Sequence, residues 1–148
     1  MNSITHHCLA AFFAVTLSTA PTVRAEDAKV SHQYADNDGV KIHYVTAGEA
    51  GPLVVMIHGF PDFWYSWNDQ IKALQSTHRV AAIDQRGYNR SDKPKGLENY
   101  AIPKLVSDVA AVIRDMGETK AVIVGHDWGG MVAWTLAMTK PERTDRLA

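Results

Sequence analysis

The feature that most constrains how this chain can fold is residues 120–130, an apolar run that ends abruptly in Gly-His-Asp-Trp-Gly at residues 125–129. The pattern predicts a buried strand, a sharp turn and then a helix. Glycines two residues on either side of Asp127 are typical of a tight turn that lifts one side chain above the carboxyl edge of a sheet. A simpler interpretation stays open, because aspartate is a good cap for a helix N-terminus and glycine is common at strand–helix turns.

An aspartate at the tip of such a turn has a different chemistry from a serine. A carboxyl group with a reference pKa of about 3.9 is ionised at neutral pH, so it can attack without a base to remove a proton. We therefore expect Asp127 to attack an sp3 carbon rather than take part in ordinary acyl transfer. Displacement of a halide or an epoxide oxygen would leave an alkyl ester on Asp127, which water would then hydrolyse.

The composition indicates an ordinary globular chain with one domain of modest size. Of the 148 residues, 46% are hydrophobic and 21% are charged, and no segment is repetitive. The formal net charge is −1 and the Lys and Arg residues are scattered, so nothing favours nucleic acid or an anionic membrane as a partner. We expect a small-molecule substrate.

Residues 1–25 differ from the rest and resemble a secretory signal peptide. The almost uncharged apolar stretch of residues 8–20 is followed by small residues at Val23 and Ala25, which suit cleavage after Ala25, and it is short for a membrane span. The stretch before it has no Lys or Arg, so an uncleaved anchor or a misassigned start codon stays an alternative. We expect an exported protein, periplasmic or secreted, with residues 26–148 as the mature domain and no membrane contact after cleavage. Since Cys8 is the only cysteine, this domain would have no disulfide and no thiolate metal site.

Beyond residue 30, strand-like and helix-like stretches alternate. Asp38-Gly39 is a strong hairpin signal between strand-like runs that begin at Ser31 and end at Val45, and residues 53–57 are a continuous apolar run of the kind buried in a parallel sheet. The other expected elements are a helix through Ile71 and Leu74 that starts in a capping box of Ser66 and Asp69, a strand over residues 79–83, a polar loop over residues 84–94, a helix from Ile102 to Met116 that stops at Gly117, a strand over residues 121–124 and a helix over residues 131–138. This alternation predicts an α/β fold with a mostly parallel sheet and helices on both faces.

Three segments, in their order and spacing, resemble one protein family. They are His58-Gly-Phe-Pro-Asp-Phe-Trp-Tyr-Ser-Trp67, Asp84-Gln-Arg-Gly-Tyr-Asn-Arg-Ser-Asp-Lys-Pro94 and Gly125-His-Asp-Trp-Gly-Gly130. Together they resemble the α/β-hydrolase family and, within it, the branch of epoxide hydrolases and haloalkane dehalogenases. The resemblance covers about residues 30–148. It implies the N-terminal part of an α/β-hydrolase fold, with the cap and the C-terminal strands missing.

The resemblance also implies roles for individual residues. Asp127 would be the nucleophile, and Phe60 and Trp128 would donate backbone N–H groups to an oxyanion hole. His58 and Pro61 would shape the loop that carries the first of these donors. The residues expected to contact the substrate are Trp128, His58, Pro61 and Trp64. No cofactor and no metal is implied.

Several of these residues have structural explanations as well. A hydrogen-bonded structural role is favoured for His58 because it lies on the loop of the oxyanion donor, and His126 is expected to point away from the nucleophile. The aromatic residues of the first segment can pack in the core or against a cap, or they can line a substrate channel. These are Phe63, Trp64, Tyr65 and Trp67. Asp84, His126 and Asp127 match no metal-ligand pattern.

The choice between the two branches depends on the leaving group. The indole N–H of Trp128 suits a departing halide, but by resemblance many dehalogenases have Asn where this chain has Phe60, whereas Phe is common in epoxide hydrolases. We therefore favour an epoxide-hydrolase-like activity, with haloalkane dehalogenase as the alternative. In that branch the acid for epoxide opening is a pair of cap tyrosines, which would lie beyond residue 148. The chain departs from the family at Asn89, where Gly is usual.

The base that activates water follows the nucleophile in this family, and no histidine follows Asp127 in the sequence. Glu142 and Asp145 come too soon, at the expected end of the last helix, to be the acid of the triad. We therefore expect an N-terminal portion of an epoxide-hydrolase-like enzyme that is inactive on its own. A truncated product or binding protein with this fold and no turnover is the alternative from another class. The oligomeric state is not predicted.

Overall fold

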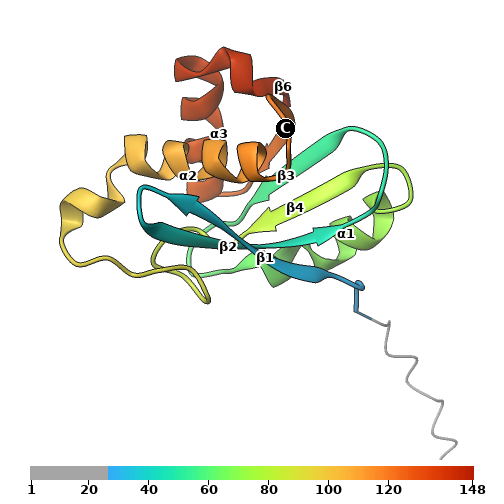
Figure 1. The fold of residues 1–148 in the computed structure, drawn as a ribbon, viewed down its shortest axis with the longest axis horizontal. Helices are drawn as coiled ribbons and strands as arrows, with labels where there is room; N and C mark the ends of the chain where they lie inside the picture. The colour runs from blue at the N-terminus through green and yellow to red at the C-terminus, as the bar shows by residue number, and fades with distance from the viewer. Residues whose placement is uncertain (1–26) are drawn as a thin grey trace, which may run out of the picture.

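The computed structural model of the chain describes residues 27–148, so the expected signal peptide lies outside the described residues. These residues form one six-stranded sheet in the order β1-β2-β4-β3-β5-β6, with three α-helices packed against it (Figure 1). The strands are β1 (Ser31–Asn37), β2 (Val40–Ala47), β3 (Leu53–Ile57), β4 (Arg79–Ile83), β5 (Ala121–Gly125) and β6 (Thr144–Leu147). β1, β2 and β4 pair antiparallel, and β4, β3, β5 and β6 pair parallel. The expected α/β fold with a mostly parallel sheet is confirmed.

The hairpin between β1 and β2 forms at the expected dipeptide. Asp38 and Gly39 both have positive φ, 53° and 81°, as a two-residue hairpin turn of the primed kind requires. Asn37 pairs with Val40 directly across this turn.

The core is split between the two faces of the sheet, and β3 supplies both halves. Leu53, Val55 and Ile57 pack in the cluster under α2 (Ile102–Asp115) and α3 (Trp128–Thr139), whereas Val54 and Met56 pack in the cluster under α1 (Asn68–Leu74). All five residues of β3 are buried. Figure 1 shows α2 and α3 on one side of the sheet and α1 on the other.

The start of the first helix differs from the expected capping box. A 3-10 turn, η1 (Trp64–Trp67), precedes α1, whose N-cap is Trp67 and has no side-chain hydrogen bond. The Ser66 hydroxyl donates to the Phe63 carbonyl, 3.0 Å away, instead of accepting from the next turn. The capping-box prediction is wrong because Ser66 lies within the 3-10 turn, where its side chain reaches the carbonyl three residues back.

The helix α2 ends as its sequence predicts. Gly117 has φ 76°, and its N–H bonds to the Arg114 carbonyl, while the Glu118 N–H reaches the Ile113 carbonyl. This pair of bonds satisfies carbonyls that the end of a helix leaves free. The residue Arg86, in the loop after β4, donates to both carboxylate oxygens of Asp108 on α2, at 2.5 and 2.6 Å, so a buried ion pair ties that loop to the helix.

The C-terminal segment is more regular than expected. α3 begins at Trp128, three residues before the predicted start, and a short 3-10 turn, η3 (Pro141–Arg143), leads into β6. A strand, β6, begins at Thr144 and pairs with β5. Asp145 therefore lies on a strand rather than at a helix end, where it forms an ion pair of 2.6 Å with Lys120.

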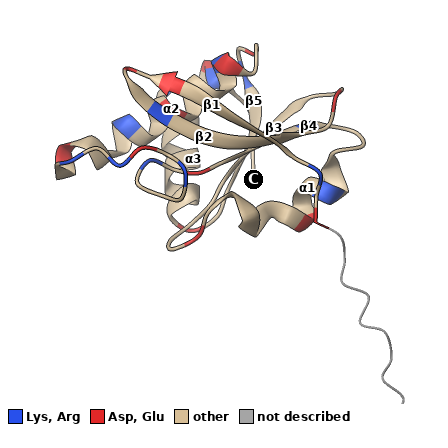
Figure 2. Cartoon of the chain, turned by 60° about the horizontal axis from the view of Figure 1, so that its bottom comes forward, with Lys and Arg blue, Asp and Glu red and all other residues tan. Residues whose placement is uncertain are grey.

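Two further properties concern the surface. Acidic and basic residues are interspersed along the ribbon in Figure 2. No helix within residues 27–148 is long and apolar enough to cross a bilayer.

Candidate active site

The turn between β5 and α3 holds Asp127 in an unusual backbone conformation, with φ 53° and ψ −121°. The glycines around it are required by close packing. A Cβ on Gly125 would lie 2.5 Å from the Gly129 carbonyl oxygen, and a Cβ on Gly129 would lie 2.1 Å from that of Ile57. Such positive φ at a residue other than glycine costs free energy and persists where the surroundings impose it, often at functional sites.

The Asp127 side chain does not cap the helix that follows it. Its Oδ1 instead accepts a hydrogen bond of 3.0 Å from the backbone N–H of Phe60, in the loop after β3. That loop comes so close that a Cβ on Gly59 would lie 2.6 Å from the Cβ of Asp127. The simpler interpretation, in which the Asp127 side chain caps the helix, is therefore not what the structure shows.

The electrostatics of the turn favour an ionised Asp127. The pKa of this carboxyl is lowered below its usual value, mainly by the hydrogen bond from the backbone N–H of Phe60 and next by that from the backbone N–H of Trp128. The carboxylate is exposed to solvent. The two expected oxyanion donors and the expected nucleophile therefore lie together, with the Phe60 N–H bonded to the carboxylate.

His58 lies beneath this arrangement rather than on its surface. Its ring is fully buried, Nδ1 bonds to the Gly59 carbonyl at 2.7 Å, and Nε2 accepts the backbone N–H of Gln85 at 3.0 Å. Burial is the main cause that lowers the pKa of His58, so the ring is neutral at physiological pH. We expected His58 to contact the substrate, but its side chain has no exposed surface in this structure. The ring supports the loop instead.

The other expected substrate contacts divide into exposed and packed residues. Trp128 is 50% exposed, and Pro61 is exposed next to Phe60, to which it is joined by a cis peptide bond. Trp64 is half-buried, packs against the core under α1 and lies edge-on to His32. Its backbone N–H donates to Asp84, so packing and loop support account for this residue.

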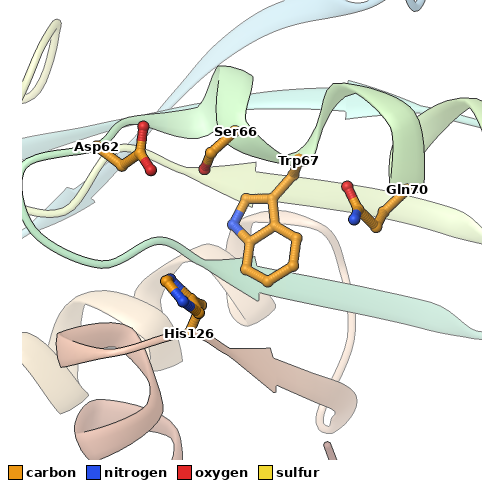
Figure 3. Close-up of a pocket in the computed structure, with 5 residues that line it drawn as sticks. All are labelled: Asp62, Ser66, Trp67, Gln70 and His126. Carbon is orange, nitrogen blue, oxygen red and sulfur yellow. The ribbon is translucent and has the colours of Figure 1, made fainter.

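His126 points into a different recess. It lies at the end of β5 and, with Asp62, Ser66, Trp67 and Gln70, lines a pocket of about 290 Å³ on the α1 side of the sheet (Figure 3). Asp127 is not part of this lining. Trp67 packs against the core with its ring, and its indole N–H is buried without a hydrogen-bond partner among the described residues.

The loop of residues 84–94 contributes more to the site than its sequence suggested. Asp84 is fully buried and accepts hydrogen bonds from His43, from the Trp64 N–H and from the side chain of Asn89. Asn89 has φ 38°, which glycine adopts freely and asparagine tolerates, and it gains a bond of 2.8 Å to Asp84 that glycine could not make. Among residues 27–148, no group of three or more His, Cys, Asp or Glu side chains is arranged to hold a metal ion.

Comparison with known proteins agrees with this geometry. A family model described as alpha/beta hydrolase fold matches residues 52–148. The chain belongs to the α/β-hydrolase fold family. This match includes all three segments that carry the resemblance, from the loop after β3 to the turn at Asp127.

Several relatives of this chain are epoxide hydrolases. Epoxide hydrolase 1 of Caenorhabditis elegans is 51% identical over 109 residues, 73% of this chain and 27% of that protein. Epoxide hydrolase B of Mycobacterium tuberculosis is 48% identical over 116 residues, 76% of this chain and 33% of that protein. The structure of an epoxide hydrolase from an endophytic Streptomyces matches with a TM-score of 0.77 and 43% identity, over 80% of this chain and 36% of that one. The chain falls in the epoxide-hydrolase branch and spans about a third of the length of these relatives.

Proposed function

We propose that Asp127 is the nucleophile of an epoxide hydrolase and forms a covalent alkyl ester with one carbon of the epoxide. The observation that carries this proposal is the Asp127 carboxylate at the tip of the turn after β5, with the Phe60 N–H bonded to its Oδ1 at 3.0 Å. The family membership and the epoxide hydrolases among the relatives support it.

The reaction would proceed in two steps. An Asp127 oxygen attacks an epoxide carbon, the bond from that carbon to the epoxide oxygen breaks, and the oxygen stays on the neighbouring carbon as an alkoxide that takes a proton from water. A water molecule then attacks the ester carbonyl, gives up a proton to solvent, and the diol is released with the Asp127 carboxylate restored. The N–H groups of Phe60 and Trp128 would stabilise the oxyanion of this second step, with a contribution on the order of 3 kcal/mol per donor.

An apolar recess lined by Trp128, the residue after the proposed nucleophile, fits the non-reacting part of such a substrate. It has a volume of about 160 Å³ and is walled by Trp128, Tyr88, Tyr100 and Leu105, with Arg86 and Gln85 as its polar members. Aromatic and aliphatic walls with few polar groups are typical of small-molecule sites. We propose that the substrate is an epoxide with a small apolar substituent.

Haloalkane dehalogenase is the second candidate, because the half-exposed Trp128 indole could hold a halide. The exposed side chain next to the other oxyanion donor is Phe60, which is 67% exposed and offers no second donor to a halide ion. This difference, with the names of the relatives, favours the epoxide.

Release of the ester needs a group that takes a proton from water. Among the described histidines, His43 and His58 are buried with both ring nitrogens engaged. His32 stacks on His43, His78 bonds to Thr77, and His126 lines the pocket beside Trp67. We propose that residues 1–148 alone form the ester faster than they release it. Adduct on Asp127 without sustained turnover is therefore the expected behaviour of this chain.

The test is to incubate the chain with a small, reactive alkyl halide or epoxide and to map adducts by peptide mass spectrometry. We expect one adduct, on Asp127. Asp127→Asn should lose it, because the amide keeps the size of the side chain and tolerates positive φ but is not nucleophilic. Asp69→Asn is the matched control, since the Asp69 side chain is 87% exposed and outside the site.

Three outcomes would contradict parts of the proposal. Equal labelling of Asp127→Asn would show that Asp127 is not the nucleophile. A folded chain that no probe labels would favour the alternative of a protein with the hydrolase fold and no catalysis. Sustained turnover by residues 1–148 would show that a base is present after all.

A further inference from the structure

Gln85, the second residue after β4, is a buried polar residue whose backbone N–H and side-chain amide both donate to His58. Its backbone N–H donates to His58 Nε2 at 3.0 Å, and its side-chain amide donates to the His58 carbonyl oxygen at 2.6 Å. Only 7% of Gln85 is exposed. One residue thus holds both the ring and the carbonyl of its neighbour.

The hydrogen bonds continue from His58 to the nucleophile. The His58 Nδ1 bonds to the Gly59 carbonyl, which also accepts the Asp62 N–H at 3.0 Å. The next residue, Phe60, donates its N–H to Asp127. Residues 58–60 therefore connect the Gln85 amide to the Asp127 carboxylate through a continuous series of hydrogen bonds and peptide bonds.

This loop needs an external restraint because of the glycine within it. Gly59 cannot carry a Cβ, since that atom would lie 2.6 Å from the Cβ of Asp127. Glycine leaves the backbone more conformational freedom than any other residue, so the direction of the Phe60 N–H depends on the hydrogen bonds that hold the peptides on both sides of Gly59. The carbonyls on either side of Gly59 are the points where hydrogen bonds can fix it, and Gln85 holds the first of them.

On its opposite side, the loop packs against the start of α3, just after the turn that carries Asp127. A Cβ on Gly129 would lie 2.1 Å from the Ile57 oxygen and 2.5 Å from the His58 oxygen, so the His58 carbonyl lies between the Gln85 amide and the backbone of α3. Loss of the amide would leave this carbonyl buried with one partner fewer, which favours rotation of the peptide away from its present direction.

We propose that Gln85 is a positioning residue of the site, whose side-chain amide fixes the His58 carbonyl and thereby directs the Phe60 N–H at Asp127. The proposal rests on the proposed function in one respect only: that function makes the Phe60 N–H an oxyanion donor and Asp127 a nucleophile. Gln85 itself does not touch the reacting atoms. Gln85 also lines the recess with Trp128, but a residue that acted only as a pocket wall or as general support would not be expected to affect the Phe60 N–H in particular.

The experiment compares the full chain with Gln85→Met, which keeps the length of the side chain and removes the donor. Two readouts report on the Phe60 hydrogen bond without any reaction: the titration of the Asp127 carboxyl carbon by NMR, and hydrogen exchange of the Phe60 amide. Because the Phe60 N–H is the main cause of the low pKa of Asp127, this pKa should move up towards its ordinary value in Gln85→Met. The Phe60 amide should exchange roughly fivefold faster, the factor that one net hydrogen bond corresponds to.

The matched control is Asn37→Leu, which removes another buried side-chain amide. Asn37 bonds to Asp108 and Ser107 on α2, so its loss lowers stability, and it leaves the Arg86–Asp108 ion pair in place and removes no hydrogen bond of residues 58–62. We expect neither readout to move in this control. Equal values of both readouts in Gln85→Met and the unchanged chain would overturn the proposal.

A second variant covers the case in which Gln85→Met does not fold. In Gln85→Glu the side chain donates to the His58 carbonyl only when it is protonated, so protection of the Phe60 amide should fall as the pH rises through the titration of this group. Protection that follows the same pH course as in the unchanged chain would overturn the proposal. Because none of these readouts needs an adduct, a failure of the labelling test at Asp127 would stay distinguishable from a failure of this inference.

Discussion

The contact of α3 with the end of β3 is closer at one glycine than at its neighbour. A Cβ on Gly129 would meet the Ile57 carbonyl oxygen at 2.1 Å, whereas the nearest atom to a Cβ on Gly130 is 3.6 Å away, an ordinary contact. The two positions are adjacent in the same helical turn, so they form a matched pair in which only the packing differs.

Gly129→Ala should therefore destabilise the fold and Gly130→Ala should not. We expect Gly129→Ala to cost roughly 1–3 kcal/mol of unfolding free energy through overpacking against rigid backbone. Gly130→Ala should be neutral or gain up to about 1 kcal/mol, since alanine is the better helix former. Urea denaturation followed by circular dichroism measures both, and equal stabilities of the two variants would contradict the close approach at Gly129.

At the scale of elements, the loop of residues 84–94 is organised by Asp84. This carboxylate joins three parts of the chain, because His43 belongs to β2, Trp64 to η1 and Asn89 to the loop itself. Burial by itself raises the pKa of Asp84, but the hydrogen bonds from His43 and from the backbone N–H groups of Trp64 and Arg90 outweigh it, and the net pKa is lowered.

The lowered pKa of Asp84 predicts the pH dependence of stability. A carboxyl group whose pKa is lower in the folded state contributes stability above its unfolded pKa of about 3.9, and this contribution is lost as the pH falls through the folded pKa. Asp84→Asn should cost about 1–3 kcal/mol at pH 7, and its stability should fall less steeply below pH ~4 than that of the unchanged chain.

Urea midpoints at neutral and acid pH test this prediction. Asp92→Asn is the control from the same loop, because the exposed Asp92 side chain accepts one bond, from the Lys41 N–H, and should cost about 1 kcal/mol or less. A parallel acid profile of Asp84→Asn and the unchanged chain would mean that Asp84 does not carry the effect.

How far the sequence predicts the structure also differs between elements. The strands at residues 53–57 and 79–83 have the expected ends, because a continuous apolar run bounded by breakers has few alternatives in an α/β sheet. β6 was missed because Thr-Asp-Arg-Leu has no apolar run, and both of its central side chains are exposed at the edge of the sheet. Periodicity reports burial, so it does not detect a strand that is held mainly by its backbone.

The candidate site also contains residues that the sequence predicted and residues that it did not. Asp127, Phe60 and Trp128 were predicted because each lies at a fixed offset within a short motif. The support from Gln85 and Asp84 was not predicted, since it consists of hydrogen bonds between segments 20 to 41 residues apart, whose distance no local spacing encodes. The only signal was a cluster of polar residues directly after a buried strand, at the carboxyl edge where active sites of such sheets lie.

At the scale of the whole molecule, the N-terminal segment predicts export. We propose that the chain is cut after Ala25, because residues 8–20 are apolar and Val23 and Ala25 are small. N-terminal sequencing of protein recovered from the extracytoplasmic fraction should start at Glu26. An intact Met1 in the cytoplasm would contradict this prediction, and an intact Met1 in the membrane fraction would favour an uncleaved anchor.

The outer side of α3 predicts how residues 26–148 behave as a molecule on their own. Three apolar side chains one helical turn apart are exposed there, Met131 (46%), Trp134 (64%) and Met138 (76%), and they continue the exposed Trp128. β6 contacts α3 and is the last strand of the sheet, with one edge free of pairing among the described residues. Apolar patches and unpaired strand edges both promote association.

We expect residues 26–148 to self-associate through this side of α3. Trp134→Lys combined with Met138→Lys should shift the protein towards the monomer, because two charges interrupt the apolar side chains without touching the core. Leu97→Lys is the control, since Leu97 is 90% exposed in η2 (Leu97–Tyr100), is not part of the exposed face of α3, and adds the same kind of charge. Size-exclusion chromatography with light scattering over a range of concentrations gives the mass of each variant. A monodisperse monomer at every concentration would mean that the exposed face of α3 is tolerated in water, and an equal shift by Leu97→Lys would mean that net charge, rather than this face, controls association.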